Sequence, residues 1–233
     1  MTRRISIIAM ATLALSTLLL PTSHAAEVRY ITVKAQGSVK VTPDAVRINA
    51  TATHLASTSK DALAATAKTA AALRSVLKNS KIDSKDIATT SVTTFPEYKY
   101  GNDGVTTLLG YRATQSFTIT VKAAESAGTI VDALVAAGGD NVQINGVSPF
   151  VLNSSKAADA ARAIAVKNAK ARALSYAKLL GVTLGKVNYL IEESAPTPPS
   201  PIFATAKSEA DATVVDLGQQ EVVVAITVQW SLR

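Results

Sequence analysis

Apolar and polar residues alternate with a period of two near both ends of the chain. The alternation runs through 29–41, resumes through 45–55 and returns in the closing segment "EVVVAITVQWSLR". A period of two predicts strands that bury one face. Thr42-Pro43-Asp44 separates the first two strands. Proline removes a backbone donor and aspartate favours turns, so Pro43 and Asp44 are predicted to form a structural turn that sets register, with a subunit contact as the alternative role.

Helical spacing appears in three further segments. Apolar residues recur at every third or fourth position in the segment ending at Asn79, in 124–136, and in the alanine-rich segment 155–180. Gly138-Gly139 and Gly181 are predicted to close the second and third helices. The alanine positions of the third helix predict that it lies close against a sheet.

A long β-hairpin is predicted between the first two helices. Its arms are 87–100 and 105–121, both rich in threonine, and the glycine-flanked tetrapeptide 101–104 gives the turn. With strands at 141–152 and 184–194, the element order is β-β-α-β-β-α-β-α-β-β. This order predicts an α+β fold, mainly an antiparallel sheet with helices packed on one face. The similar order in the two halves of the chain suggests two fused sub-modules.

The N-terminal segment has the pattern of an export signal. Arg3 and Arg4 precede an apolar run over 5–20, and small residues stand at the −3 and −1 positions of a cut after Ala25. We therefore expect a signal peptide over 1–25, a single domain over 26–233 and a periplasmic or secreted location. No later apolar run is long enough to span a bilayer. The proline-rich segment 195–220 lacks periodicity and is expected to be an exposed loop within the domain.

Composition argues against most catalytic chemistry. The chain has no cysteine, and its formal charge of +7 falls to +5 once the two arginines of the signal are removed. His54 is the one histidine of the exported portion, so a Cys/His nucleophile, thiol-based peroxide reduction and an N/S zinc site are all excluded. Glu192 and Glu193 are adjacent on a strand and point to opposite faces. We predict no catalytic, cofactor-binding or metal-binding residue, and a protein that is not an enzyme.

Several segments, in this order, resemble one family. They are "GSVKVTPDAVRI", "KIDSKDIATTSVTTFPEYKY", "GYRATQSFTITV", "IVDALVAAGGDNVQINGVSPFVL", "ARAIAVKNAKARALSYAKLLGVTLGKVNYLIEES" and "VVVAITVQWSL". Gly37 with Pro43-Asp44 and the segments 86–89, 110–113 and 169–185 carry the likeness. The chain is similar to the bacterial SIMPL-domain proteins over about 28–232. It departs from the family at Leu217-Gly218-Gln219, where a Pro-Gly-Glu type of entry to the last strand is usual.

The resemblance implies little chemistry. Such proteins are periplasmic or secreted and have no established mechanism or cofactor. Some are linked to oxidative-stress defence, and some form ring- or channel-like homo-oligomers. For this chain the resemblance implies a stress-linked envelope protein that assembles with itself.

Aromatic residues gather on the predicted hairpin. Phe95, Tyr98, Tyr100 and Tyr111, with Arg112, form the candidate interface, either as ordinary strand packing or as a protein–protein contact, where tyrosine is enriched. The leading hypothesis is a homo-oligomeric envelope scaffold. The alternative is a monomeric module that binds an envelope protein, a cell-wall polymer or a lipid headgroup through the basic helix 162–178 or the proline-rich segment. No nucleic-acid partner is expected, because the basic helix is nearly free of aromatics and the protein is expected to be exported.

Overall fold

A computed structural model describes residues 29–101, 104–193, 200–202 and 213–233, so the expected signal peptide over 1–25 lies outside the described residues. The elements follow the predicted order, with one short strand added in the proline-rich segment. They are β1 (Tyr30–Val41), β2 (Ala45–Ala56), α1 (Ser59–Asn79), η1 (Ser84–Asp86), β3 (Ile87–Tyr100), β4 (Thr106–Val121), η2 (Ala124–Ser126), α2 (Ala127–Gly138), η3 (Gly139–Asn141), β5 (Val142–Phe150), α3 (Ser155–Leu179), β6 (Leu184–Glu192), β7 (Ser200–Ile202) and β8 (Gln219–Leu232).

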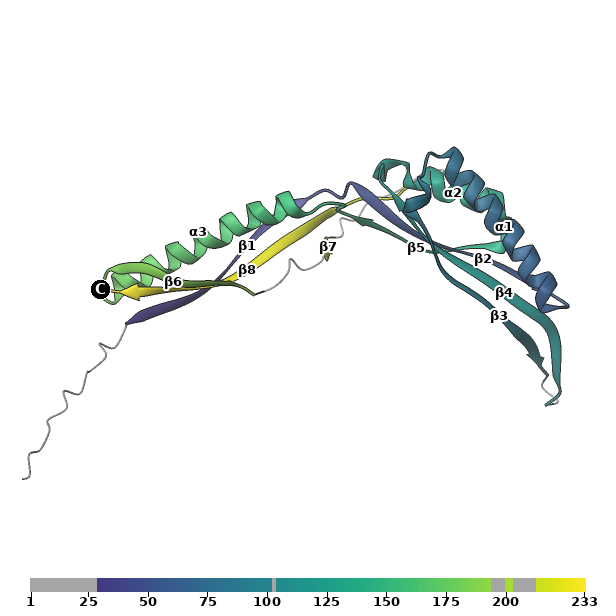
Figure 1. Cartoon of the computed structure of the whole chain (residues 1–233), viewed down its shortest axis with the longest axis horizontal. Helices are drawn as coiled ribbons and strands as arrows, with labels where there is room; N and C mark the ends of the chain where they lie inside the picture. Colours follow the sequence, from purple (N-terminus) through teal and green to yellow (C-terminus); the bar gives the residue numbers. More distant parts are fainter. Residues whose placement is uncertain (1–28, 102–103, 194–199, 203–212) are drawn as a thin grey trace, which may run out of the picture.

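The strands form two antiparallel sheets that lie end to end (Figure 1). The α1/α2 sheet has the order β3-β4-β2-β5, and the α3 sheet has the order β1-β8-β6 with β7 paired to β8. Helices pack on one face of each sheet, which confirms the α+β class. The predicted division into two sub-modules, one from each half of the chain, is wrong. β1 comes from the start of the sequence but lies in the same sheet as β6, β7 and β8 from its end. The α1/α2 sheet is instead one continuous insertion over residues 45–150.

The α1/α2 sheet has a core of branched aliphatic residues. Alternate residues of β2 and β4, such as Ile48 and Ile119, are buried beneath α1 and α2. Leu73 and Leu77 come from α1, one turn apart on its apolar face. Buried Thr66 fixes α1 to the sheet, because its hydroxyl donates to the Ala62 carbonyl at 2.9 Å and lies 3.2 Å from the Ala113 carbonyl on β4.

The α3 sheet has a core of small residues. The alanines of α3 recur every three or four residues and face β1 and β8, as their spacing predicted. The helix lies so close to β1 that a Cβ added at Gly37 would sit 2.1 Å from the Ala161 carbonyl oxygen. Gly37 therefore does not interrupt the strand; it admits the helix backbone. Asn168 and Arg172 of α3 also donate to the Gln36 and Lys34 carbonyls on β1, at 2.9 and 2.7 Å.

The segment that contains Pro43 and Asp44 links the two sheets. The strands that it joins do not pair with each other, because β1 belongs to the α3 sheet and β2 to the α1/α2 sheet. The interpretation as a turn that sets the register of β1 against β2 is therefore wrong. Asp44 instead accepts a 2.7 Å hydrogen bond from the Leu152 backbone N–H, in the connection between β5 and α3. This hydrogen bond joins two of the segments that connect the sheets, the one between β1 and β2 and the one between β5 and α3.

The proline-rich segment is only partly a loop. Residues 194–199 and 203–212 lie outside the described residues, β7 pairs with β8, and β8 already begins at Gln219. Thr213 binds Asp132 of α2 through its hydroxyl at 2.6 Å, and Val215 and Leu217 pack against the α1/α2 core. The prediction of an exposed loop to residue 220 is therefore wrong for its last part, where Val215 and Leu217 are partly buried and Val214 alone of the three apolar side chains is exposed.

Candidate functional site

The β3–β4 hairpin is the most extended feature of the α1/α2 sheet. β3 is an edge strand, and the hairpin continues past the start of α1 (Figure 1). Most side chains of β3 are exposed, and so is the first part of β4. A long edge strand presents unpaired backbone donors and acceptors, which makes it a template for pairing with another chain. The predicted interface residues all lie on this hairpin.

The three predicted aromatics of β3 are exposed. The exposed fractions are 45% for Phe95, 44% for Tyr98 and 77% for Tyr100. Phe95 is paired with Arg112 and Tyr98 with Leu108, so the extra residue of this bulge lies on β4, and β3 alternates without interruption from Phe95 to Tyr100. Phe95 therefore lies on the opposite face of the hairpin from the two tyrosines. Tyr111 is half-buried on β4, opposite Pro96.

Arg112 is held by an ion pair across the hairpin. Its guanidinium donates from Nη2 to Glu97 Oε1 at 2.9 Å and from Nε to Oε2, so the pair is bidentate. These hydrogen bonds lower the pKa of the Glu97 carboxyl and raise that of Arg112. Glu97 lies two positions nearer the turn than Phe95, whose register partner is Arg112, so the ion pair runs diagonally across the hairpin and keeps both side chains in one orientation.

The apolar residues on the other arm were not predicted from the sequence to be part of the interface. Val105, Leu108 and Leu109 are each more than two-fifths exposed. The signal was available in "VTTLLGY", where an apolar pair stands beside the turn. Tyr98 and Leu108 are register partners, so the tip of the hairpin carries apolar surface on both arms.

The face of the α1/α2 sheet away from the helices is a ladder of hydroxyl and amide groups. Thr93 and Thr114 pair across β3 and β4 at 2.6 Å, and Thr51 and Ser116 pair across β2 and β4 at 3.0 Å. Asn145 of β5 donates to Thr51 at 2.7 Å. Cross-strand pairs of this kind stabilise a sheet, so the ladder extends from β5 to the hairpin and braces it.

The side chains considered for catalysis, His54, Glu192 and Glu193, make structural contacts. His54 faces α1, where its Nε2 lies 2.8 Å from the Thr69 hydroxyl, and burial lowers its pKa. Glu192 binds Arg162 of α3, whereas Glu193 binds Lys34 and Thr227 on the other face, as predicted for adjacent strand residues. Across the described ranges, no group of three or more His, Cys, Asp or Glu side chains is placed to hold a metal ion.

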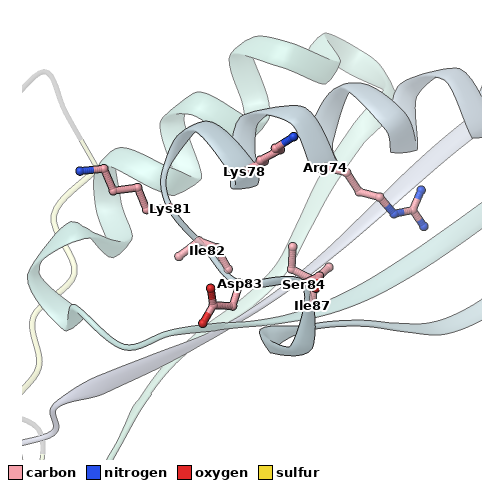
Figure 2. Close-up of a pocket in the computed structure, with 7 residues that line it drawn as sticks. All are labelled: Arg74, Lys78, Lys81, Ile82, Asp83, Ser84 and Ile87. Atoms are coloured by element: carbon pink, nitrogen blue, oxygen red, sulfur yellow. The ribbon is translucent and has the colours of Figure 1, made fainter.

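A basic groove of about 560 Å³ lies between the last turns of α1 and the start of β3 (Figure 2). Arg74, Lys78 and Lys81 stand along its α1 side, and the partly buried Ile82 and Ile87 form an apolar floor. Arg74 also lies 5.0 Å from the centroid of the Phe117 ring, which is a cation–π contact. Asp83 and Ser84 complete the lining, so the groove carries three cations and one carboxylate and can attract an anion.

The basic helix proposed for the alternative hypothesis is partly neutralised. Arg162 pairs with Asp159 at 2.6 Å and with Glu192 at 2.8 Å, which raises its pKa. Arg172 donates to β1. The other cations of α3 are Lys156, Lys167, Lys170 and Lys178, and all four are exposed. Within the basic helix 162–178, the cations without an ion pair among the described residues therefore lie beyond Arg162.

Comparisons with known proteins identify the family of this chain. The model of the SIMPL family, described as a protein of unknown function (DUF541), matches residues 31–230. The chain therefore belongs to the SIMPL family, which confirms the resemblance found in the sequence.

Among the described residues, no helix has the length and apolar character needed to cross a membrane.

Three relatives illustrate the breadth of the family. The chain is 30% identical to the 26 kDa periplasmic immunogenic protein of Brucella melitensis over 74% of this chain and 70% of that protein. It is 29% identical to the uncharacterized protein YggE of Escherichia coli K12, over 78% of this chain and 72% of the relative. The YggE of Edwardsiella ictaluri is 31% identical over 63% of this chain, and the match spans 62% of that relative's length.

Proposed function

We propose that this SIMPL protein is an exported, non-enzymatic scaffold that assembles with copies of itself in the cell envelope. The observation that carries the proposal is the β3–β4 hairpin, a braced edge that extends past α1 and exposes Phe95, Tyr98 and Tyr100. Tyrosines and apolar residues at a strand edge are suited to a contact between protein chains. The ion pair between Glu97 and Arg112 adds orientation to that contact.

The location and the role in stress are part of the same proposal. The sequence pattern over 1–25 supports export, and the Brucella relative is named as periplasmic. A protective role under oxidative stress follows from the resemblance alone. Because the chain has no cysteine, such protection acts through assembly or a partner and not through a thiol of this protein.

A matched pair of double variants tests the interface. Tyr98→Ala/Tyr100→Ala is expected to lower the assembled mass, or to raise the concentration needed for assembly at least about tenfold, because buried tyrosines concentrate binding energy. Tyr176→Ala/Tyr189→Ala removes two other exposed tyrosines, outside the hairpin, and is expected to leave assembly unchanged. Analytical ultracentrifugation of residues 26–233 measures both. If the two double variants assemble alike, the hairpin is not the interface.

A further inference from the structure

Three chain segments meet at the end of the α3 sheet. The start of β1, the corner between α3 and β6, and the end of β8 are joined by backbone hydrogen bonds: Leu232 N to Arg29 O at 2.9 Å, and Thr183 and Arg233 to each other at 2.8 and 2.9 Å. We call residues 29–30, 178–186 and 233 the α3 tip. It forms the end of the molecule opposite the hairpin (Figure 1).

Two adjacent leucines protrude from the α3 tip. Leu179 is 79% exposed and Leu180 66%, more than any other leucine, isoleucine or valine that the structure describes. They lie beyond Ala177, the last buried alanine of α3, and the chain then turns at Gly181, where φ is +68°. The leucine pair therefore cannot reach the core of the α3 sheet from this corner. Tyr30 is also exposed at the same end.

The surroundings of the leucine pair are basic. The segments that build this end of the sheet, residues 29–43, 160–191 and 222–233, contain no aspartate or glutamate. Arg29, Lys178, Lys186 and Arg233 are exposed, and none of them forms an ion pair among the described residues. Apart from the α-carboxyl group of Arg233, the α3 tip is cationic. Protruding leucines within a cationic surface complement an anionic lipid interface, which takes apolar groups below negatively charged headgroups.

The path of the chain brings the α3 tip close to a membrane. The apolar run over 5–20 enters the fold through residues 21–29, and β1 begins at Tyr30 within the tip. Nine residues span at most about 30 Å when fully extended. While the apolar run is in a bilayer, the tip is therefore held within that distance of the lipid surface, whereas the hairpin lies at the far end of the molecule.

We propose that the α3 tip is a contact site for an anionic lipid membrane, in which Leu179 and Leu180 enter the interface and the neighbouring lysines and arginines lie at the headgroups. This proposal does not depend on assembly through the hairpin, because the two surfaces share no residue. In an assembled protein, several tips on one surface would strengthen the contact.

Vesicle flotation tests the proposal with residues 26–233, which retain every described residue and lack the apolar run. Vesicles contain phosphatidylglycerol with phosphatidylcholine, or phosphatidylcholine alone. We expect the protein to float with the anionic vesicles, less so at high salt. Leu179→Ser/Leu180→Ser is expected to lower the partition coefficient at least about tenfold, because it removes two inserted side chains. The control, Leu63→Ser/Val135→Ser, alters exposed residues of α1 and α2 and is expected to leave binding unchanged.

Two kinds of result would refute the proposed membrane contact. If the wild-type chain does not float, or if the leucine variant floats as well as the control, the tip does not contact membranes. Lys178→Ala/Lys186→Ala separates charge from insertion. If that variant loses binding while the leucine variant retains it, the surface attracts polyanions in general, such as a wall polymer, and the membrane site is refuted. Circular dichroism confirms that each variant keeps its fold.

Discussion

Replacing Gly37 with alanine is expected to destabilise the protein by about 3 kcal/mol, a large share of the total stability of a domain. The added Cβ would lie 2.1 Å from the Ala161 carbonyl oxygen and 2.4 Å from the Ala165 backbone nitrogen. Both atoms belong to the backbone of α3, so no side-chain rotation relieves the clash. The whole helix has to move away from β1, which opens the packing of its alanine face.

Urea denaturation measures the effect, and Gly146→Ala is the matched control. Gly146 is also a strand glycine, but the nearest atom to its added Cβ, Asn49 Nδ2, is 3.9 Å away. Its substitution is expected to change the free energy of unfolding by less than about 0.5 kcal/mol. Equal effects of the two substitutions would mean that α3 does not lie against β1 at Gly37.

Leu73→Ala is expected to cost about 3 kcal/mol through the core of the α1/α2 sheet. Leu73 is 2% exposed and packs between α1 and the sheet, so its truncation leaves a cavity. Leu63→Ala on the same helix, where the side chain is 43% exposed, is expected to cost less than about 1 kcal/mol. Thermal unfolding compares the two, and equal costs would contradict the orientation of α1.

The effects of Gly37→Ala and Leu73→Ala are expected to add. The two substitutions act on separate core clusters with no residue in common. Distant sites without shared partners are usually independent. A double variant that loses much less stability than the sum would indicate that the two sheets do not unfold in one cooperative transition.

The local elements were predictable from the sequence, because they follow from periodicity and turn chemistry. The two arms of the hairpin and the alanine face of α3 appear where the pattern placed them. The partition into sheets was not predictable in this way. Whether β1 pairs with β2 or with β8 depends on contacts between residues far apart in sequence, such as Val33 with Val228, which are 195 residues apart. A period of two shows that a strand has a buried face, but not which strand is its neighbour.

The two candidate surfaces differ in the same way, because the hairpin could be predicted from the sequence and the α3 tip could not. The aromatics of the hairpin were found because they are rare in this chain and stand close together. The exposed leucine pair at 179–180 was not predicted, because these residues continue the helical spacing of α3. They lie outside the core only because the alanines of α3 approach β1 so closely. Exposure of an apolar residue at the end of a helix is a property of the tertiary fold.

The most direct test of self-assembly is the solution mass of residues 26–233, measured by light scattering after gel filtration at two salt concentrations. We expect a defined multimer at both salt concentrations, because the aromatic edge of the hairpin associates mainly through apolar surface and backbone pairing. A monomer at every protein and salt concentration would contradict the scaffold.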